Sequence, residues 1–304
     1  MKKKIRLTVY LLFVLGMYYA FRIYHWERPP LPSWHTMVHR GAGIGRPENT
    51  LESFKFSWSL GLAPEADLRM TKDNIIICFH DDEIDRVVAN PPQKLKKVPV
   101  KDINYNTLKK LDVGSKFGKK YTGQRIPKLV DVFKAMQDHP DRYLYLDIKR
   151  VFLDNLEELV KEYKVADQVI LTTNNYDVLR RWRIQMPGSK TMLWTKGNDA
   201  WLKNTMTTVR KHGFFGLTHF QLNISKIKGG KESFILSAKM IRKISKELRK
   251  YGIVPQAFPI NLSAPEIYQE LSKLGIISFG TDYPEEIVKF IDSKNDLSKL
   301  NAAH

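Results

Sequence analysis

Charged side chains recur at two-residue spacing on two predicted strands, where buried charges would need a ligand, a metal ion or one another as partners. Glu65 and Asp67 lie in "EADLRMT", and Asp147 and Lys149 lie in "RYLYLDIKR". Residues i and i+2 of a strand point to the same face. Carboxylates on the inner face of a buried strand are costly unless a metal, a ligand or a partner satisfies them. A polar strand edge for the first pair and a buried ion pair for the second remain alternatives.

The segment "VHRGAGIGRPENTLESF" places a histidine and an arginine at the root of a glycine-rich loop. Apolar residues stop being periodic here and polar residues crowd together, directly after a proline-rich linker. The three glycines let the loop fold close to a ligand. We expect Glu48 and Asn49 to brace this loop and to cap a helix that begins at Thr50.

A second histidine follows in "TKDNIIICFHDD", residues 71–82, which we interpret as the return strand of a hairpin. If a four-residue turn closes the hairpin, Met70 faces Ile75 and Glu65 faces His80. This register would bring His80 to the same surface as the acidic pair. A histidine held by hydrogen bonds to its neighbours is the alternative.

Short β-rich runs alternate with amphipathic runs along most of the chain, which predicts a single (β/α)₈ TIM barrel. A doubly wound sheet is the alternative, although no second domain boundary is visible. The long polar segment 83–126 is expected to be a small insertion after the second strand. The predicted strands are 35–40, 65–71, 142–149, 168–173, 190–195, 215–220, 253–260 and 276–281, and the helices include 128–138, 151–163, 176–184, 232–250 and 285–292. Four helices are expected to end in left-handed glycines at Gly61, Gly213, Gly252 and Gly275.

The chain begins with "MKKKIR", and a run of apolar residues follows. We predict that residues 1–28 form an uncleaved hydrophobic helix that anchors the protein in a membrane, with a cleaved signal peptide or a buried helix as alternatives. The proline-rich residues 29–34 would be a linker to a domain over 35–304. The basic start would keep the N-terminus cytoplasmic and place the domain on the extracytoplasmic side, or release it as a secreted or periplasmic protein after cleavage.

The 304-residue chain carries a formal net charge of +18, which favours anionic partners. Its one cysteine excludes an internal disulfide framework and a cysteine-based zinc cluster. No aromatic–basic interleaving supports nucleic-acid binding, so none is expected. The sequence contains no P-loop or dinucleotide-binding pattern.

Four segments in order, "HRGAGIGRPENTLESF", "EADLRMTKDNIIICFHDDEIDRV", "YLYLDIK" and "FGTDYP", strongly resemble the glycerophosphodiester phosphodiesterase family. The resemblance runs from about residue 36 to 290 and implies the same barrel fold. Two departures are visible. The third metal ligand of the family is usually a glutamate in an E-x-K strand motif, where this chain has Asp147, and the family's aromatic strand-seven motif is replaced by "AFPINLS".

The resemblance implies a role for each matching residue. His39 and His80 would be the acid–base pair, and one divalent cation, Ca²⁺ or Mg²⁺, would suit an all-oxygen site. The implied metal ligands are Glu65, Asp67 and Asp147, and the implied phosphate-binding residues are Arg40 and Lys149.

The expected function is metal-dependent hydrolysis of glycerophosphodiesters to an alcohol and glycerol 3-phosphate. The substrate would be a glycerophosphodiester or a lysophospholipid. One alternative is a lysophospholipase D or sphingomyelinase D-like enzyme on membrane lipids, since the latter branch resembles this chain in using Asp-x-Lys. A catalytically weakened barrel that binds an anionic ligand is the other. The sequence does not define the alcohol or the oligomeric state.

Overall fold

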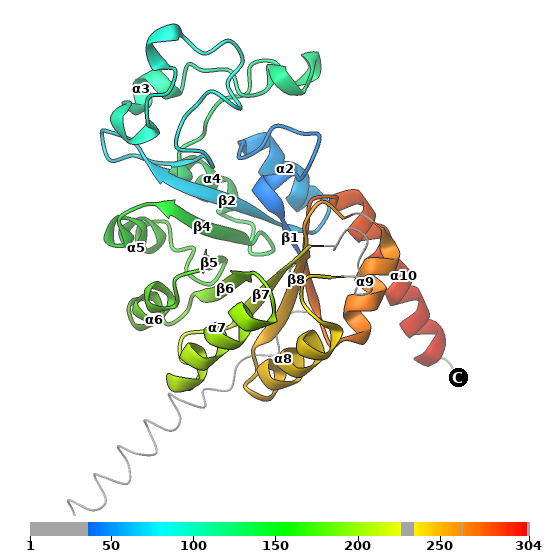
Figure 1. Cartoon of the computed structure of the whole chain (residues 1–304). Helices are drawn as coiled ribbons and strands as arrows, with labels where there is room; N and C mark the ends of the chain where they lie inside the picture. Colours follow the sequence, from blue (N-terminus) through cyan, green and yellow to red (C-terminus); the bar gives the residue numbers. More distant parts are fainter. Residues whose placement is uncertain (1–35, 226–233, 263, 303–304) are drawn as a thin grey trace, which may run out of the picture. The chain divides into compact units, whose positions relative to one another are not determined.

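Eight parallel strands close into a barrel, which confirms the predicted (β/α)₈ fold (Figure 1). The computed structural model describes residues 36–225, 234–262 and 264–302. The ring closes because β1 pairs with both β2 and β9, while β3 adds an antiparallel hairpin strand to β2. The strands are β1 (Met37–Val38), β2 (Ala63–Met70), β3 (Ile76–Cys78), β4 (Leu144–Arg150), β5 (Val169–Thr173), β6 (Lys190–Lys196), β7 (His219–Ile224), β8 (Val254–Pro259) and β9 (Ser278–Thr281).

Helices follow the barrel strands in chain order and surround the barrel (Figure 1). Each of the four predicted glycine ends is confirmed, because all four glycines have positive φ directly after α2, α7, α8 and α9. The barrel helices in the described residues are α2 (Leu51–Ser59), α4 (Leu129–Met136), α5 (Leu153–Glu162), α6 (Tyr176–Gln185), α7 (Asp199–Lys211), α8 (Ala238–Lys250), α9 (Pro265–Lys273) and α10 (Pro284–Ala302).

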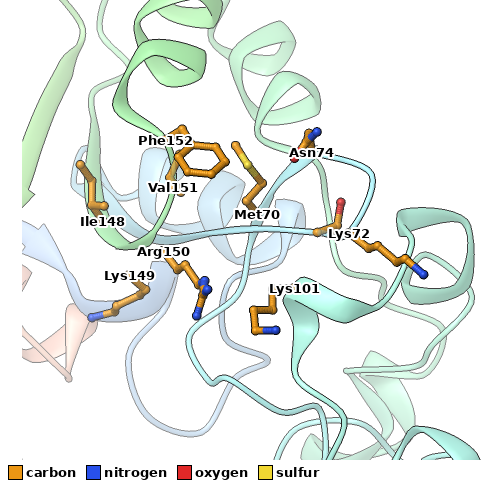
Figure 2. A pocket seen from close by; sticks show the side chains of 10 residues that line it. Met70, Lys72, Asn74, Lys101, Ile148, Lys149, Arg150, Val151 and Phe152 are labelled. Carbon is orange, nitrogen blue, oxygen red and sulfur yellow. The ribbon is translucent and has the colours of Figure 1, made fainter.

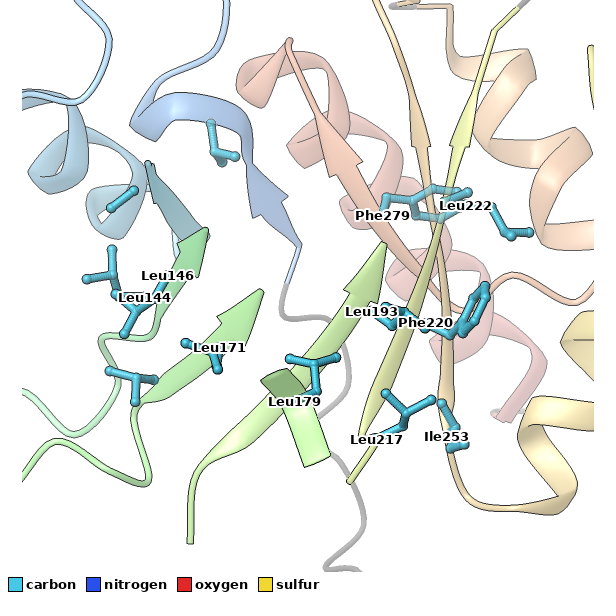
Figure 3. Close-up of a cluster of buried hydrophobic side chains, with 14 of the residues drawn as sticks. Leu144, Leu146, Leu171, Leu179, Leu193, Leu217, Phe220, Leu222, Ile253 and Phe279 are labelled. Carbon is cyan, nitrogen blue, oxygen red and sulfur yellow. The ribbon is translucent and has the colours of Figure 1, made fainter. Parts of the chain in front are cut away.

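Strand alternation divides the apolar core into two layers. Leu144 and Leu146 of β4 and Leu171 of β5 belong to the main cluster with the helices (Figure 3). Tyr145 and Ile170, which alternate with them, belong to a separate cluster, and Tyr145 is fully buried. Burial of each large side chain contributes about 1.5–3 kcal/mol. The barrel is therefore a packed frame that holds the ends of its strands in place.

The first strand is shorter than the predicted 35–40, since β1 covers only Met37–Val38. A single 3-10 turn, His39–Gly41, follows at once, and Arg40 adopts a left-handed backbone with φ of 53°. The chain therefore leaves the barrel directly after β1 and places His39 and Arg40 at the carboxyl end of the strand.

The predicted strand 215–220 was displaced by four residues, since β7 begins at His219. Phe214 and Leu217 are buried, but they belong to the loop before the strand, where Phe214 and Gly216 have positive φ. A short apolar run alone does not distinguish a buried loop from a strand.

The hairpin is confirmed, but its predicted register is wrong by one residue. Met70 pairs with Ile76 rather than with Ile75. The loop has three residues between Thr71 and Ile75, and Asn74 is left-handed with φ of 59°. This is a common hairpin loop, in which a left-handed residue closes a tight turn.

The insertion after the hairpin has its own small apolar core. Ile84, Val88, Leu108 and Ile126 are buried in a cluster that is separate from the barrel core. Its ordered elements are short, so packing around this cluster and hydrogen-bonded turns hold the segment together. They are η2 (Gln93–Leu95), η3 (Val100–Asp102), α3 (Tyr105–Leu108), η4 (Ser115–Phe117) and η5 (Lys119–Tyr121).

The predicted N-terminal anchor, residues 1–28, and the linker 29–34 lie outside the described residues. Among the residues that are described, no helix has both the length and the apolar character needed to cross a membrane.

Candidate active site

Three carboxylates meet at the carboxyl ends of two neighbouring strands. Glu65 and Asp67 of β2 and Asp147 of β4 each offer an oxygen, and these oxygens lie within 4.8 Å of one another. Asp67 and Asp147 are direct partners in the β2–β4 register. Their exposures of 3%, 0% and 6% show that all three are buried. Barrel enzymes carry their active sites at this end of the strands.

Lys149 lies between two of these carboxylates. Its Nζ is 2.5 Å from Asp147 Oδ2 and 3.0 Å from Asp67 Oδ1. The β2–β4 register skips this residue, since Leu68 pairs with Ile148 and Arg69 with Arg150. An extra residue of this kind in a strand redirects its side chain. The residue at this irregularity is Lys149, whose ammonium group contacts the acidic cluster.

Burial and mutual repulsion govern the ionisation of the cluster. Burial first, and then Asp67 and Asp147, raise the pKa of Glu65 well above its usual range. Burial also works to raise the pKa of Asp67, but Lys149, His80 and the other donors around it lower the pKa overall. For Asp147, burial dominates and the pKa is raised despite Lys149.

The donor set fits a hard divalent cation. Three buried carboxylate groups face Lys149 and, at 3.9 Å from Asp67, the Arg40 guanidinium, so the cluster has an excess of negative charge when it is ionised. Trp194 on β6 donates to Asp147 Oδ1 at 3.3 Å, and the Arg40 amide donates to Glu65 Oε2 at 2.6 Å. These hydrogen bonds hold the carboxylates in place, as supporting contacts do around metal ligands. Glu65, Asp67 and Asp147 could therefore bind a metal ion.

The glycine-rich loop is fastened to the cluster by Asn49. The Asn49 amide donates to Asp67 Oδ2 at 2.7 Å, and its oxygen accepts from the Asp67 amide at 2.9 Å. Glu48 accepts from the Arg40 guanidinium at 3.2 Å. The predicted helix cap is corrected, because Thr50 rather than Glu48 or Asn49 caps α2, its Oγ1 accepting from the Ser53 amide.

His39 is fixed by residues from the far end of the chain. Its Nδ1 is 2.7 Å from Asp282 Oδ1, directly after β9, and its ring lies 4.9 Å from that of Phe258. Asp282 Oδ2 also accepts from the Asn261 amide at 2.9 Å. The closed barrel therefore orients this histidine and leaves its Nε2 for a ligand.

His80 has a similar partner, but a local one. Its Nδ1 is 2.6 Å from Oδ1 of Asp81, the next residue. Arg86 donates to Asp81 at 2.5 Å and to both oxygens of Glu48 at 2.6 and 2.7 Å. Arg86 therefore connects the insertion to the loop that carries Arg40.

Sequence reasoning assigned no roles to Asp282, Asp81, Arg86 or Trp194. An aspartate directly after a histidine and an aspartate after the last strand were visible signals. Arg86 and Trp194 gave none, because Arg86 joins the insertion to Glu48, 38 residues away, and the partner of Trp194, Asp147, lies 47 residues away.

Gly43 allows the first loop to contact the last one. It has φ of 68°, and a Cβ at this position would lie 2.1 Å from the Asp282 carbonyl oxygen. The same carbonyl accepts from the Ile44 amide at 2.9 Å. Gly43 therefore lets the two loops that hold His39 and Asp282 pack backbone to backbone.

The barrel and its mouth define a class of protein, a (β/α)₈ barrel with a buried acidic cluster that could bind a metal ion and two aspartate-paired histidines. The sequence pattern of the Glycerophosphoryl diester phosphodiesterase family matches residues 39–286. The chain belongs to this family, as its motifs had indicated.

Relatives agree with this assignment over most of the chain. A glycerophosphodiester phosphodiesterase of Caldanaerobacter subterraneus subsp. tengcongensis is 28% identical over 263 residues, which cover 84% of this chain and 96% of that protein. A human lysophospholipase D is 29% identical over 153 residues, but these cover only 47% of this chain and 46% of that protein. The full-length similarity therefore lies with the glycerophosphodiester phosphodiesterases.

A solved structure shows the same fold. An Oleispira antarctica phosphodiesterase, solved in complex with the product sn-glycerol-3-phosphate, superimposes with a TM-score of 0.61 at 20% identity. The match covers 84% of this chain and 96% of that one.

Proposed function

We propose that this protein hydrolyses glycerophosphodiesters, with water, to an alcohol and glycerol 3-phosphate. The observation that carries the proposal is the buried cluster of Glu65, Asp67 and Asp147 with two aspartate-paired histidines at the same mouth. Membership of the family supports it. The product bound to the Oleispira antarctica relative supports glycerol 3-phosphate as the phosphorylated product here.

The three carboxylates would hold one divalent cation, Ca²⁺ or Mg²⁺ in preference to Zn²⁺, since every donor is an oxygen. When bound, the cation would stabilise the negative charge that develops on the phosphoryl oxygens. Asp147 is one methylene shorter than the usual glutamate of the family, and it nevertheless reaches the other two carboxylates. This geometry supports Asp147 as the third ligand.

The histidines would transfer the protons. In each ring, Nδ1 faces an aspartate, which favours the tautomer that carries its proton on Nδ1 and leaves Nε2 as the acceptor. One histidine would accept the proton of the attacking water, and the other, in its protonated form, would donate to the leaving alkoxide. Both side chains are about 30% exposed, so Nε2 can meet a substrate.

Arg40 and Lys149 would bind the phosphate. Arg40 lies between Glu48 and Asp67, with Nε 3.9 Å from Asp67 Oδ2. Lys149 already contacts two of the carboxylates, and these raise its pKa although burial alone would lower it. A permanently charged lysine beside the cluster would offset the charge of a phosphodiester.

The proposal is tested with full-length protein in detergent, glycerophosphocholine and lysophosphatidylcholine as substrates, and Ca²⁺, Mg²⁺ or EDTA. We expect release of glycerol 3-phosphate from glycerophosphocholine with a metal, and loss of turnover with EDTA and in Asp147→Ala. Lys161→Ala, an exposed change on α5, is the control. Turnover of lysophosphatidylcholine alone would contradict the proposal and favour the lipid-directed alternative.

We further propose that residues 1–28 anchor the domain over 35–304 to a membrane through the linker 29–34, on the extracytoplasmic side. The basic start and the apolar run that follows it support this placement. Fractionation with protease accessibility tests it. A processed N-terminus in the soluble fraction would instead indicate a cleaved signal peptide and a secreted or periplasmic enzyme.

A further inference from the structure

A pocket of about 350 Å³ opens where the ends of β2 and β4 meet the insertion (Figure 2). We call it the side pocket. Its walls come from the ends of β2 and β4, the hairpin turn and η3, and its cationic lining residues are Lys72, Lys101, Lys149 and Arg150. Its volume is within the range of about 300–1,000 Å³ that is typical of small-molecule sites.

Lys149 lies at the boundary between the side pocket and the proposed catalytic site. It is one of the lining residues, but its side chain points away from Arg150 and Lys101 in Figure 2, and its Nζ contacts Asp67 and Asp147. Arg150 follows Asp147 by three residues on β4, so the side pocket lies next to the place where a reacting phosphate would bind.

The charges in the side pocket are poorly balanced. Figure 2 shows the Arg150 guanidinium and the Lys101 side chain in the same part of the pocket. Among the described residues, Lys101 pairs only with its exposed neighbour Asp102, at 2.7 Å, and Arg150 and Lys72 have no carboxylate within 4.0 Å. An anion between Lys101 and Arg150 would relieve their repulsion.

The insertion wall of the pocket is fastened to the hairpin turn. The Lys72 amide donates to the Ile103 carbonyl at 3.1 Å, and the Tyr105 amide donates to Asp73 Oδ1 at 2.9 Å. These bonds hold η3, with Lys101, against the end of β2. The cations therefore come from two elements whose relative position is fixed, which lowers the entropic cost of binding.

We propose that the side pocket binds a second phosphate carried by the alcohol part of the substrate. The inference rests on the proposed function and narrows its substrate class to glycerophosphodiesters whose alcohol is itself phosphorylated. The Arg150 fork can bind two phosphate oxygens, and Lys101 adds a point charge. Ile148 and Phe152 supply an apolar wall for the carbon skeleton between the two phosphates.

The test compares glycerophosphoglycerol with the same compound carrying a terminal phosphomonoester, with full-length protein and phosphorus NMR to follow the diester. We expect a higher kcat/KM for the phosphorylated substrate. Arg150→Gln and Lys101→Gln should each reduce this preference about tenfold or more, as for a hydrogen bond to a charged group, and leave kcat/KM for glycerophosphoglycerol within about twofold. Lys94→Gln, an equal change of charge on η2, should leave the preference intact.

Calorimetry with two unreactive probes separates the inference from the proposed function. Glycerol 1,3-bisphosphate should bind the wild type more tightly than glycerol 3-phosphate does, and Arg150→Gln should abolish the difference. Equal binding of both probes, or an equal loss in both substrates on Arg150→Gln, would overturn the side-pocket assignment. Absence of diester hydrolysis alongside a bisphosphate preference would instead refute the proposed function.

Discussion

The two histidines of the mouth are held in opposite ways. His39 is paired with Asp282, 243 residues away, so its orientation depends on closure of the whole barrel. His80 is paired with its neighbour Asp81, and Arg86 and Glu48 connect that pair to the first loop. The barrel half of the site is therefore built by long-range packing, whereas the insertion half is built by local hydrogen bonds and ion pairs. The insertion half should therefore open locally more easily than the barrel half, without unfolding of the whole protein.

The largest expected effect comes from removing either imidazole. His39→Ala and His80→Ala should each lower kcat by about 10²–10⁴-fold, the usual contribution of a general acid or base. The double variant should be little worse than the single ones, since groups that act as a unit are not additive. Initial rates of glycerophosphocholine hydrolysis test this. A normal rate in either single variant would remove that histidine from the mechanism.

Replacing the aspartate partner of each histidine should distinguish the barrel half of the site from the insertion half. Asp282→Asn should lower kcat by about 10–100-fold with KM little changed, since loss of a supporting carboxylate misplaces His39. Asp81→Asn should have a smaller effect, because Arg86 stays bound to Glu48. Steady-state kinetics of the two variants make the comparison. A larger effect for Asp81→Asn would reverse the proposed order.

The contact between the loop after β1 and the loop after β9 can be tested by replacing Gly43. Gly43→Ala should destabilise the protein by about 1–3 kcal/mol, the cost of strained backbone, because the added Cβ meets the Asp282 carbonyl. Gly45→Ala is the matched control, since Gly45 also has positive φ, 87°, but nothing within 4 Å of its Cβ position. Denaturant unfolding measures both. Equal losses of stability in the two variants would show that the positive φ alone, and not the contact with Asp282, causes the destabilisation.

Arg86→Gln should loosen the insertion half specifically. We expect kcat/KM to fall by a few fold to about tenfold, as for loss of hydrogen bonds to charged groups, and proteolysis within 83–126 to accelerate. Arg125→Gln is the control, because the exposed Arg125 side chain lies 3.9 Å from Asp112, which keeps its hydrogen bonds to Ser115 and Gly123 in the variant. Protection of the insertion equal to that of the wild type would argue against Arg86 as its main connection.

The smallest expected effect is a loss of stability of the insertion at acidic pH. Burial opposes ionisation of Asp81, but hydrogen bonds from His80 and Arg86 hold its pKa well below the usual range. A depressed carboxyl pKa stabilises the folded form above the unfolded value, about 3.9, and this contribution is lost as pH falls towards the folded value. Hydrogen exchange between pH 5 and pH 3 should show the insertion opening first, and less pH dependence in Arg86→Gln.

The sequence predicted the barrel well because its signals are local. Apolar runs, amphipathic helices and glycine ends each depend on a few neighbouring residues, and Gly61 and Gly252 have the left-handed backbone that was expected. The prediction from sequence was wrong where tertiary packing, rather than the local sequence, determines the structure. Leu217 was assigned to a strand although it belongs to a buried loop before β7.

The site was predictable in its residue types but not in its connections. The clustering of Glu65 and Asp67 with Asp147 followed from strand alternation once the fold was known. The hairpin register was missed by one residue, because Thr71 and Ile75 pair and leave a three-residue loop that ends in left-handed Asn74. The pairing of His39 with Asp282 depends on closure between the first and last strands, which no local pattern encodes.

The most direct test of the central claim is a phosphorus NMR time course of glycerophosphocholine with full-length protein, with and without a divalent cation. The account predicts that the diester resonance is replaced by the monoester resonance of glycerol 3-phosphate in the presence of Ca²⁺ or Mg²⁺, and that EDTA stops the reaction. An unchanged diester resonance with a folded protein and every metal tried would contradict it.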